Sequence, residues 1–358
     1  MRPTVLEVDK NKFKNNIKLI REFVPNKEIL PVIKANGYGT YINKQLDIIN
    51  DFNIVGVAIV DEAIELRKLG FNKEILVLNQ PSFDEIDDIE KYNIIVGLSS
   101  IEFLNYVINN NRSIKVHLEI ETGMNRTGIK IDDIDFVVDK IIKYKKIIVE
   151  GIYTHLSSAD YDKEYTNMQL SLFDKSVSII KNKINTIKYV HSQASNGILN
   201  YKDSVTNLVR AGIIMYGYES FVNSSKIINV EPICKLKTKI TYLKEINSNE
   251  SVSYGRRYIS KKKMKVATIP IGYADGLRRE LFNKGQVVVD NKKVDIIGTI
   301  CMDSCMIDVT SIKNVKVGDT VYIWDNKFIT LDDIANKCNT INYEVLSTIS
   351  ERVPRKFI

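Results

Sequence analysis

The sequence predicts an α/β protein, with an N-terminal (β/α)8 TIM-type barrel followed by a C-terminal mainly β domain. Short runs rich in Val and Ile alternate with longer segments of helical periodicity through the first two thirds of the chain. These runs are continuously apolar, which indicates a parallel sheet covered by helices. Eight such strand–helix units within about 215 residues fit a closed barrel better than an open sheet.

The predicted barrel strands are apolar runs bounded by turn residues or by the start of a helical pattern. They cover residues 29–34, 54–59, 74–78, 94–97, 115–120, 147–155, 189–192 and 209–215. Apolar residues at helical spacing predict helices over residues 61–69, 82–91, 101–109, 131–144 and 167–184. These segments assign residues 1–224 to the barrel.

The pattern changes near Ser224, where the apolar runs become shorter and Gly, Asn and Asp turns separate them. Strands are predicted over residues 228–242, 265–271, 286–289, 293–297 and 319–324, with one late helix over residues 331–337. We therefore expect residues 225–358 to form a mainly β domain.

Composition excludes several classes of protein. Of 358 residues, 44% are hydrophobic and 27% charged, as in ordinary folded proteins. The net charge of +7 is mild and the basic residues are interleaved with acidic ones, so we expect no nucleic-acid partner. No long apolar window and no hydrophobic leader are present, so we expect no membrane association and a cytoplasmic location.

Cysteine and histidine offer little material for a metal site. The four cysteines, Cys234, Cys301, Cys305 and Cys338, form no CxxC pair, and the three histidines show no ligand spacing. We therefore expect no metal. Cys301 and Cys305 lie in an apolar stretch, which favours buried and inert thiols.

Lys34 is the first candidate for chemistry. Residues 31–39 read PVIKANGYG, so this lysine closes the first predicted strand, and functional residues of such barrels lie at the carboxyl ends of strands. Partial desolvation there disfavours the charged ammonium and makes the amine a better nucleophile. Taken alone, Lys34 is also explained as an ordinary lysine that reaches the surface.

Motifs along essentially the whole chain resemble those of the alanine racemases, a family of barrel-type pyridoxal-phosphate enzymes. Residues 32–39 resemble the lysine motif of that family, and residues 121–128 (ETGMNRTG) resemble its DTGMxRxG segment. Further matches, in the order of the family, are residues 154–155, 209–213 (VRAGI), 252–255 (VSYG), 271–276 (IGYADG), 301–303 (CMD), 340–344 (TINYE) and 352–355 (RVPR). Each match is weak alone, but the ordered set is specific.

The resemblance implies how a pyridoxal 5'-phosphate cofactor would be held. Lys34 would bind it covalently, and Arg210 would face the pyridine nitrogen. Because arginine does not give up its proton, that nitrogen would stay unprotonated, which weakens the cofactor as an electron sink. The other cofactor-binding residues that the resemblance implies are His155 and, around the phosphate, Tyr38, Ser195, Gly212, Ile213 and Tyr343.

Racemisation needs proton transfer on both faces of one carbon, so two bases on opposite faces are the economical arrangement. The resemblance implies Lys34 for one face and Tyr254 for the other. A tyrosine with an ordinary pKa of about 10 is a poor base near neutrality, so nearby cations must favour its phenolate. The substrate carboxylate would meet the backbone N–H of Met302, with Arg126 nearby. The supporting residues are Glu119, Tyr273 and Asp303.

The resemblance also implies a homodimer. In this family the residues that match Tyr254 and Met302 come from the neighbouring subunit, so each β domain would complete the site of its partner. A two-fold dimer is also the commonest oligomer. Residues that match the family positions narrowing access to the site, and so favour a small amino acid, are Asp160, Tyr273, Arg279 and Ile341.

Several of these residues have structural explanations when each is taken alone. Tyr254 precedes a glycine and is explained as a turn residue, His155 and His191 as core histidines, and Arg210 as an ion-pair partner. Only the ordered set of motifs favours the functional interpretation.

Three positions depart from the family pattern. Glu119 stands where a carbamylated lysine is usual, and its carboxylate could supply the negative group that orients Arg126. Ala194 stands where an asparagine is common, and Thr299 replaces an arginine near the access to the site. These departures leave the strictness of alanine specificity open.

We therefore expect an isomerase, an alanine racemase that interconverts L- and D-alanine and supplies D-alanine for peptidoglycan in the bacterial cell wall. One alternative is a broader amino-acid racemase that acts on serine or on basic amino acids. A second is a non-catalytic pyridoxal-phosphate carrier on the same barrel, although such carriers lack the β domain. A third is a barrel decarboxylase, against which Tyr254 argues.

Overall fold

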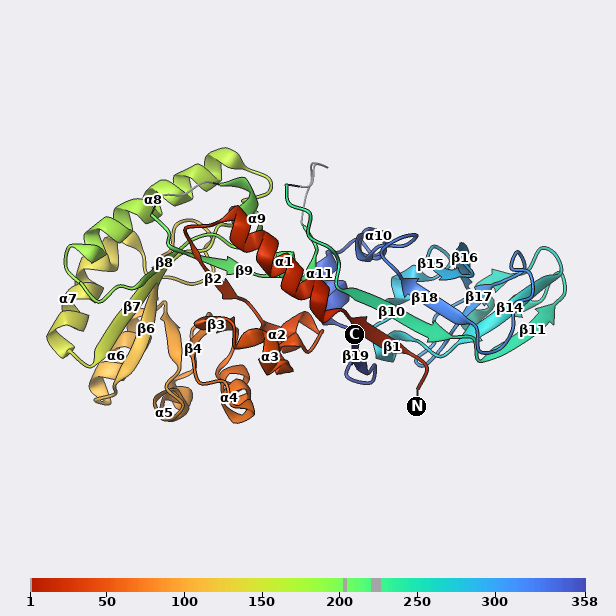
Figure 1. Cartoon of the computed structure of the whole chain (residues 1–358), viewed down its shortest axis with the longest axis horizontal. Helices are drawn as coiled ribbons and strands as arrows, with labels where there is room; N and C mark the ends of the chain where they lie inside the picture. The colour runs from red at the N-terminus through yellow and green to blue at the C-terminus, as the bar shows by residue number, and fades with distance from the viewer. Residues whose placement is uncertain (1, 202–204, 220–226) are drawn as a thin grey trace. The chain divides into compact units, whose positions relative to one another are not determined.

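The computed structural model describes residues 2–201, 205–219 and 227–358, and the chain divides into two compact units (Figure 1). The barrel unit comprises Lys14–Gly37 and Ile42–Val230, and the β unit comprises Met1–Phe13, Tyr38–Tyr41 and Glu231–Ile358. The expected boundary between residues 224 and 225 lies outside the described residues and stays a prediction.

Within the described part of the barrel unit, eight parallel strands follow one another in the predicted order (Figure 1). They are β2 (Glu28–Pro31), β3 (Ile54–Val57), β4 (Glu74–Val77), β5 (Ile95–Leu98), β6 (Ile114–Glu119), β7 (Ile147–Tyr153), β8 (Tyr189–His191) and β9 (Leu208–Ala211). Strands β3 to β8 pair in sequence, and β2 pairs with β9. Hydrogen bonds from Ile33 N–H to Gly56 O (2.9 Å) and from Arg210 N–H to Gln193 O (2.9 Å) join the two sheets into a ring. The predicted barrel is confirmed.

Helices surround this ring and cover the apolar strands. They are α3 (Leu46–Ile49), α4 (Val60–Leu69), α5 (Ile86–Lys91), α6 (Ile101–Asn109), α7 (Ile134–Tyr144), α8 (Lys163–Lys181) and α9 (Ser195–Asn200). Helix α8 begins at Lys163, four residues before the predicted start, because the Asp162 carboxylate accepts a hydrogen bond from Tyr165 N–H. Helix α1 (Lys10–Phe23) precedes β2 in the chain.

The β unit contains a mixed nine-stranded sheet, as its described residues show. Its order is β11-β14-β17-β16-β15-β18-β10-β1-β19. The bounds are β1 (Val5–Val8), β10 (Cys234–Lys239), β11 (Tyr242–Ile246), β14 (Met264–Ile269), β15 (Gln286–Val289), β16 (Lys292–Ile297), β17 (Cys305–Asp308), β18 (Thr320–Trp324) and β19 (Arg355–Phe357). A small ladder joins β12 (Ser251–Val252) to β13 (Tyr258–Ile259), and two helices follow β18, α10 (Leu331–Lys337) and α11 (Asn342–Ser347).

Strand β1 differs from the expectation that all early residues belong to the barrel. It pairs antiparallel with β10 and parallel with β19, so Val5–Val8 lies in the sheet of the β unit. A four-residue run carries no local signal of which strands will pair with it, because pairing is settled by partners far away in the chain.

The predicted strand over residues 228–242 is wrong in extent, since two strands, β10 and β11, replace it. The described part of the chain contains no helix with the length and apolar character needed to cross a membrane.

Candidate active site

Lys34 lies three residues beyond β2, at the carboxyl end of that barrel strand, and its side chain is mostly buried. Burial lowers the pKa of its ammonium, and the cationic Arg126 and Arg210 lower it further, whereas Glu62 opposes them. The amine is therefore nearer to its neutral, nucleophilic form than the amine of a surface lysine.

The chain after Lys34 makes a left-handed turn, labelled α2 (Lys34–Tyr38), with φ values of 51° at Ala35, 53° at Asn36 and 59° at Gly37. Such a turn costs roughly 1–2 kcal/mol for each residue other than glycine, so contacts must hold it. Gly37 N–H donates to Ile33 O (3.0 Å).

The carboxylate of Glu62, on α4, fixes the start of this turn. Its Oε1 accepts a hydrogen bond from Ala35 N–H (2.5 Å) and its Oε2 accepts one from Ala58 N–H (2.7 Å). The same charge acts on the Lys34 amine. Glu62 was not predicted from the sequence, because nothing in the pattern of a helical glutamate indicates that both of its oxygens bind backbone amides of the strand ends.

Arg210, on β9, is buried and contacts two histidines, His191 and His155, and the third, His117, contacts His191. Its Nη1 donates to His191 Nδ1 (2.8 Å), and its Nη2 donates to His155 Nδ1 (3.1 Å). Carbonyl oxygens of Thr154, His191 and Ser192 accept three more hydrogen bonds from these two nitrogens, at 2.8–3.0 Å. Among the described residues, every hydrogen-bond partner of this guanidinium contacts a terminal nitrogen.

These contacts determine the proton positions on the histidines. Because arginine only donates, His191 Nδ1 must accept, and His191 Nε2 then carries the proton. That Nε2 lies 2.8 Å from His117 Nδ1, which must accept in turn. His117 Nε2–H ends the chain of hydrogen bonds, buried and with no partner among the described residues.

All three histidines are held neutral. Burial, followed by the charge of Arg210, lowers the pKa of His117 and of His155 to about 3 and lowers the pKa of His191 well below its usual range. The pKa of Arg210 itself is lowered to about 10 by burial. The cluster therefore presents one fixed positive charge, on Arg210. His155 was predicted only as a cofactor-binding residue implied by the family resemblance, and His191 was explained only as a core residue.

A second polar group lies at the end of β9. Ser195 Oγ accepts hydrogen bonds from Gly212 N–H (3.2 Å) and Ile214 N–H (3.4 Å), and Ile213 lies between them, buried. Because Ser195 Oγ accepts both hydrogen bonds, its own hydroxyl hydrogen is left to donate to an anion such as a phosphate. The two tyrosines predicted for the same phosphate lie in the β unit, where the ring centres of Tyr38 and Tyr343 are 6.0 Å apart.

Glu119, the last residue of β6, is buried within this polar network. Burial raises the pKa of its carboxyl, while a hydrogen bond from Thr127 and the charge of Arg126 lower it. The hydroxyl of Tyr153 also acts on this pKa, although it donates its hydrogen to Leu78 O (2.8 Å), and Glu119 Oε2 has no hydrogen-bond partner among the described residues. Glu119 thus interacts electrostatically with Arg126 but forms no ion pair or hydrogen bond with it among the described residues, so its proposed role in orienting Arg126 stays a prediction.

Four further predicted residues belong to the β unit, Tyr254, Tyr273, Met302 and Asp303, and all four are exposed. Tyr254 is 73% exposed, Met302 52% and Tyr273 42%. The turn that carries Tyr273 is joined to the loop that carries Met302, because Tyr273 N–H donates to Cys301 O (3.1 Å) and Ala274 N–H donates to Met302 O (3.0 Å).

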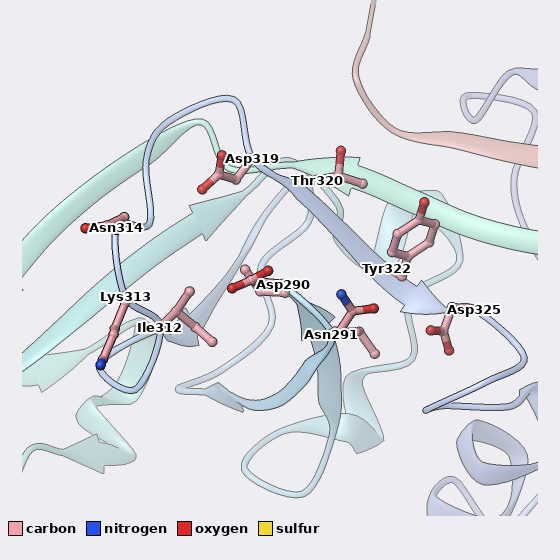
Figure 2. A pocket seen from close by; sticks show the side chains of 11 residues that line it. Asp290, Asn291, Ile312, Lys313, Asn314, Asp319, Thr320, Tyr322 and Asp325 are labelled. Atoms are coloured by element: carbon pink, nitrogen blue, oxygen red, sulfur yellow. The ribbon is translucent and has the colours of Figure 1, made fainter.

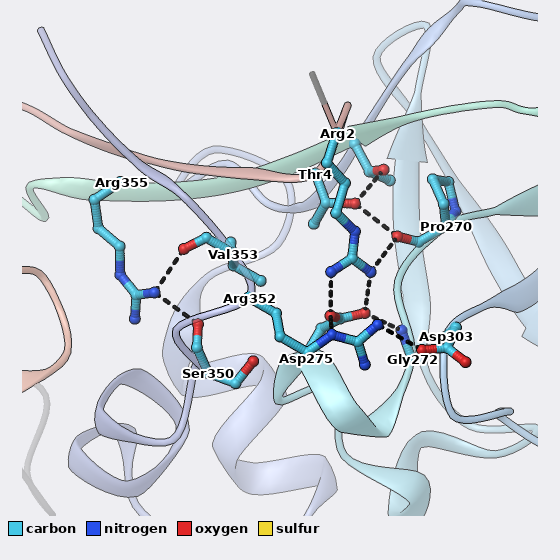
Figure 3. A network of polar contacts seen from close by, with 11 residues as sticks. Arg2, Thr4, Pro270, Gly272, Asp275, Asp303, Ser350, Arg352, Val353 and Arg355 are labelled. Carbon is cyan, nitrogen blue, oxygen red and sulfur yellow. Dashed lines mark hydrogen bonds and ion pairs between the residues drawn. The ribbon is translucent and has the colours of Figure 1, made fainter.

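Asp275 anchors that turn (Figure 3). Its fully buried carboxylate accepts hydrogen bonds from Arg2 Nη1 (2.5 Å), Arg2 Nη2 (2.6 Å) and Gly272 N–H (2.9 Å). Arg352 donates to Asp303 Oδ1 (2.6 Å) and so ties the adjacent loop to the same network. Tyr273 and Met302 thus lie on a turn and a loop that hydrogen bonds hold together.

The residues predicted to narrow access lie in both units. Asp160 is in the barrel unit and accepts a hydrogen bond from Asn196 Nδ2 (3.1 Å), and burial raises the pKa of its carboxyl. In the β unit, the guanidinium carbon of Arg279 is 5.7 Å from the centre of the Tyr273 ring, and Ile341 is exposed.

A separate cavity of about 430 Å³ in the β unit contains none of the predicted site residues (Figure 2). Asp290, Asn291, Lys313 and Tyr322 are among its lining residues. The carboxylate of Asp325, also in the lining, accepts hydrogen bonds from three successive backbone N–H groups. It therefore has an ordinary role in a turn.

A buried arginine and a lysine of lowered pKa lie at the carboxyl end of the barrel strands, where barrel enzymes have their active sites. These features indicate an enzyme that acts on a small molecule. Two family models match the chain, "Alanine racemase, N-terminal domain" over residues 8–220 and "Alanine racemase, C-terminal domain" over residues 233–357. The chain belongs to the alanine racemase family.

Relatives and solved structures agree over the full length. An alanine racemase of Methanococcus maripaludis is 37% identical, with 99% of each chain covered. The solved structure of alanine racemase from Clostridium difficile 630 has a TM-score of 0.92 at 32% identity, covering 100% of this chain and 96% of that one. The Bacillus anthracis alanine racemase, solved with bound L-Ala-P, has a TM-score of 0.93 at 31% identity, covering 100% and 95%.

Proposed function

We propose that this chain interconverts L- and D-alanine with pyridoxal 5'-phosphate as its cofactor. The observation that supports this proposal most directly is the mostly buried Lys34 amine, whose pKa is lowered by burial and by the cationic Arg126 and Arg210. The chain also belongs to the alanine racemase family. The names of the relatives support alanine as the substrate.

The residues present fit that cofactor. Lys34 supplies a nucleophilic amine for its aldehyde, and Arg210 keeps its Nε–H without a partner among the described residues, which suits a ring-nitrogen acceptor. The cofactor, when bound, withdraws electrons from the Cα–H bond of an attached amino acid. The residues proposed to receive its phosphate are Tyr38, Ser195, Gly212, Ile213 and Tyr343, with His155 beside Arg210.

Proton transfer is assigned to two side chains. The Lys34 amine serves one face of the substrate carbon and the Tyr254 phenol serves the other. Met302 N–H and Arg126 receive the substrate carboxylate, and Glu119 orients Arg126. The neutral His155 and His191 hold the Arg210 guanidinium and take up no proton, because burial keeps the pKa of each far below neutrality.

We further propose a cytoplasmic homodimer in which Tyr254 and Met302 act in the site of the partner subunit. Their exposure, 73% and 52%, supports this arrangement, because a base and a carboxylate-binding loop need cover from solvent. The barrel domain is proposed to end at residue 224. The product D-alanine would serve peptidoglycan synthesis.

The purified protein tests the cofactor directly. We expect visible absorbance from bound pyridoxal phosphate, its loss in Lys34→Ala, and loss of alanine racemisation in both Lys34→Ala and Tyr254→Phe. A colourless protein that cannot be reconstituted with pyridoxal phosphate would contradict the proposal.

Substrate range is tested by kcat/KM on alanine, serine and lysine measured side by side. We expect alanine to be preferred. A higher value on serine or lysine would support a broader racemase, and release of carbon dioxide from any of the three would indicate a decarboxylase.

A further inference from the structure

Ser253, the residue before Tyr254, has a strained backbone. Its φ of 68° and ψ of −175° lie in a region that essentially only glycine populates. Gly255 (φ 74°) and Arg256 (φ 50°) continue the left-handed path through the short helix η5 (Tyr254–Arg256). A serine in this conformation costs roughly 1–3 kcal/mol and persists only where neighbouring contacts impose it.

A reciprocal pair of hydrogen bonds holds Ser253 in this conformation. Ser253 Oγ donates to Thr299 O (2.5 Å), and Thr299 Oγ1 donates to Tyr254 O (2.9 Å). Thr299 is buried, so water does not compete strongly for these bonds. We call this pair of residues the Ser253–Thr299 clamp.

Gly298 brings the two halves of the clamp together. A Cβ atom there would lie 2.7 Å from Val252 O and 3.0 Å from Ser253 Cβ, and the φ of Gly298 is 71°. Its N–H donates to Asn283 Oδ1 (3.0 Å). The segment that carries Thr299 therefore packs against the backbone before Tyr254 and is itself fixed.

The position of the Tyr254 side chain depends on this backbone more than the position of a buried side chain would. Its side chain is 73% exposed and makes no hydrogen bond with the described residues of its own chain. The position of its phenol is therefore set by the backbone that carries it. An error of about 1 Å in the position of a reacting group can cost about a hundredfold in rate.

We propose that Thr299 is a positioning residue, and that the Ser253–Thr299 clamp fixes the Tyr254 backbone so that the phenol is aligned for proton transfer. This inference rests on the proposed role of Tyr254 as a base. Thr299, which stands where an arginine is usual, would then affect the rate of proton transfer by positioning Tyr254, in addition to any effect on substrate access to the site.

The first test compares two substitutions in the holoenzyme. Thr299→Val has nearly the same shape but lacks the hydroxyl, and Thr299→Ser keeps it. We expect Thr299→Val to lower kcat about tenfold with KM changed less than about twofold, and Thr299→Ser to stay within about threefold of the wild type. Equal kcat in Thr299→Val and the wild type would overturn the proposal.

A second readout separates positioning from general damage. Tyr254 serves one face of the substrate carbon, so a misaligned phenol should slow proton transfer for one enantiomer first. With α-deuterated L- and D-alanine, we expect Thr299→Val to raise the primary isotope effect on kcat/KM for one enantiomer more than for the other. Isotope effects unchanged for both would contradict the clamp.

The backbone strain at Ser253 provides a test that needs no measurement of racemase activity. Ser253→Gly removes the hydroxyl and also the backbone cost, whereas Ser253→Ala removes only the hydroxyl. We expect Ser253→Gly to unfold at a higher temperature than Ser253→Ala, and peptides spanning residues 252–258 to exchange amide hydrogen faster in both variants than in the wild type. Unchanged exchange in both variants would show that the clamp does not hold this segment.

Tyr254→Phe separates the two proposals. If Tyr254→Phe abolishes racemisation while Thr299→Val does not alter it, the clamp is wrong and the base assignment stands. If Tyr254→Phe racemises normally, the proposed function of Tyr254 fails first, and the clamp fails with it.

Discussion

Two glutamates act at the carboxyl ends of barrel strands in different ways. Glu62 binds two backbone amides and fixes the left-handed turn that follows the lysine, whereas Glu119 lies buried among Thr127, Tyr153 and Arg126. One carboxylate therefore shapes the backbone, and the other sets the local charge.

Glu62→Gln should destabilise the protein and lower the pKa of Lys34 further. An amide offers one acceptor oxygen where two backbone N–H groups need partners, so we expect a loss of about 2 kcal/mol in the free energy of unfolding. Urea unfolding checks this, and the pH dependence of Lys34 modification checks the pKa. Glu65→Gln, one turn further along α4, is the matched control and should change both quantities much less. Equal effects of the two variants would contradict this role of Glu62.

Glu119→Gln should lower racemase activity between about ten- and a hundredfold, because Arg126 loses the charge that orients it. The raised pKa of Glu119 also predicts a pH effect. As pH falls through that pKa, the wild type loses the carboxylate and its activity falls, whereas the variant should lack this acidic limb. Activity profiles against pH measure both effects, with Glu102→Gln as a surface control. Unchanged kinetics in Glu119→Gln would contradict the hypothesis.

How far the site could be predicted differs between its residues. Lys34, Arg210 and Tyr254 stand in motifs and were named from the sequence. Glu62 and Thr299 were not assigned their contacts, because these contacts involve backbone carbonyl and N–H groups, which every residue carries. The proton arrangement along His191 and His117 required the distances between ring nitrogens.

At the scale of elements, the turn of Gly272–Asp275 and the loop after Cys301 behave as one piece. Asp275 is fully buried and its charge is balanced by Arg2, which is itself largely covered. A Cβ on Gly272 would collide with the carbonyl oxygens of Cys301 and Met302. Tyr273 and Met302 are thus positioned by contacts that neither side chain makes.

Asp275→Asn should lower the free energy of unfolding by about 3 kcal/mol, because it leaves the Arg2 charge without its buried partner. Thermal or urea unfolding measures this. Asp303→Asn removes an exposed carboxylate from the same network and should cost much less. If the two variants lose the same stability, burial of the Asp275 carboxylate is not the cause of its contribution to the free energy of unfolding.

The elements that sequence patterns predicted well are those buried on both faces. Strands β3 and β5 are entirely buried and were found within two residues at each end. Strand β11 was not separated from β10, because most of its residues are exposed and carry no apolar pattern. Strand β19 has only three residues, none fully buried, so pairing rather than hydrophobicity defines it.

At the scale of the whole molecule, the buried histidines predict sensitivity to acid. The pKa of His117 is about 3 in the folded chain, against about 6.5 when unfolded, so the unfolded state binds more protons between these values. Stability should therefore fall as pH decreases from about 6.5, by up to about 1.4 kcal/mol per pH unit for each such histidine. The raised pKa of Glu119 acts in the opposite direction over part of this range.

Urea unfolding at several pH values between about 4 and 7 measures this slope. His117→Gln keeps an acceptor for His191 Nε2–H and removes one titrating ring, so its stability should depend less steeply on pH. A slope equal to that of the wild type would show that His117 does not carry the effect.

The place of β1 has a consequence for how the chain becomes folded. Its neighbours in the sheet are β10 and β19, which follow more than 220 and 340 residues later. During synthesis at about 5–20 residues per second, β1 must therefore wait tens of seconds for its partners while the barrel strands are made. The β unit cannot assemble its sheet from residues 225–358 alone, and a fragment cut there would leave an edge of β10 free to pair with another chain.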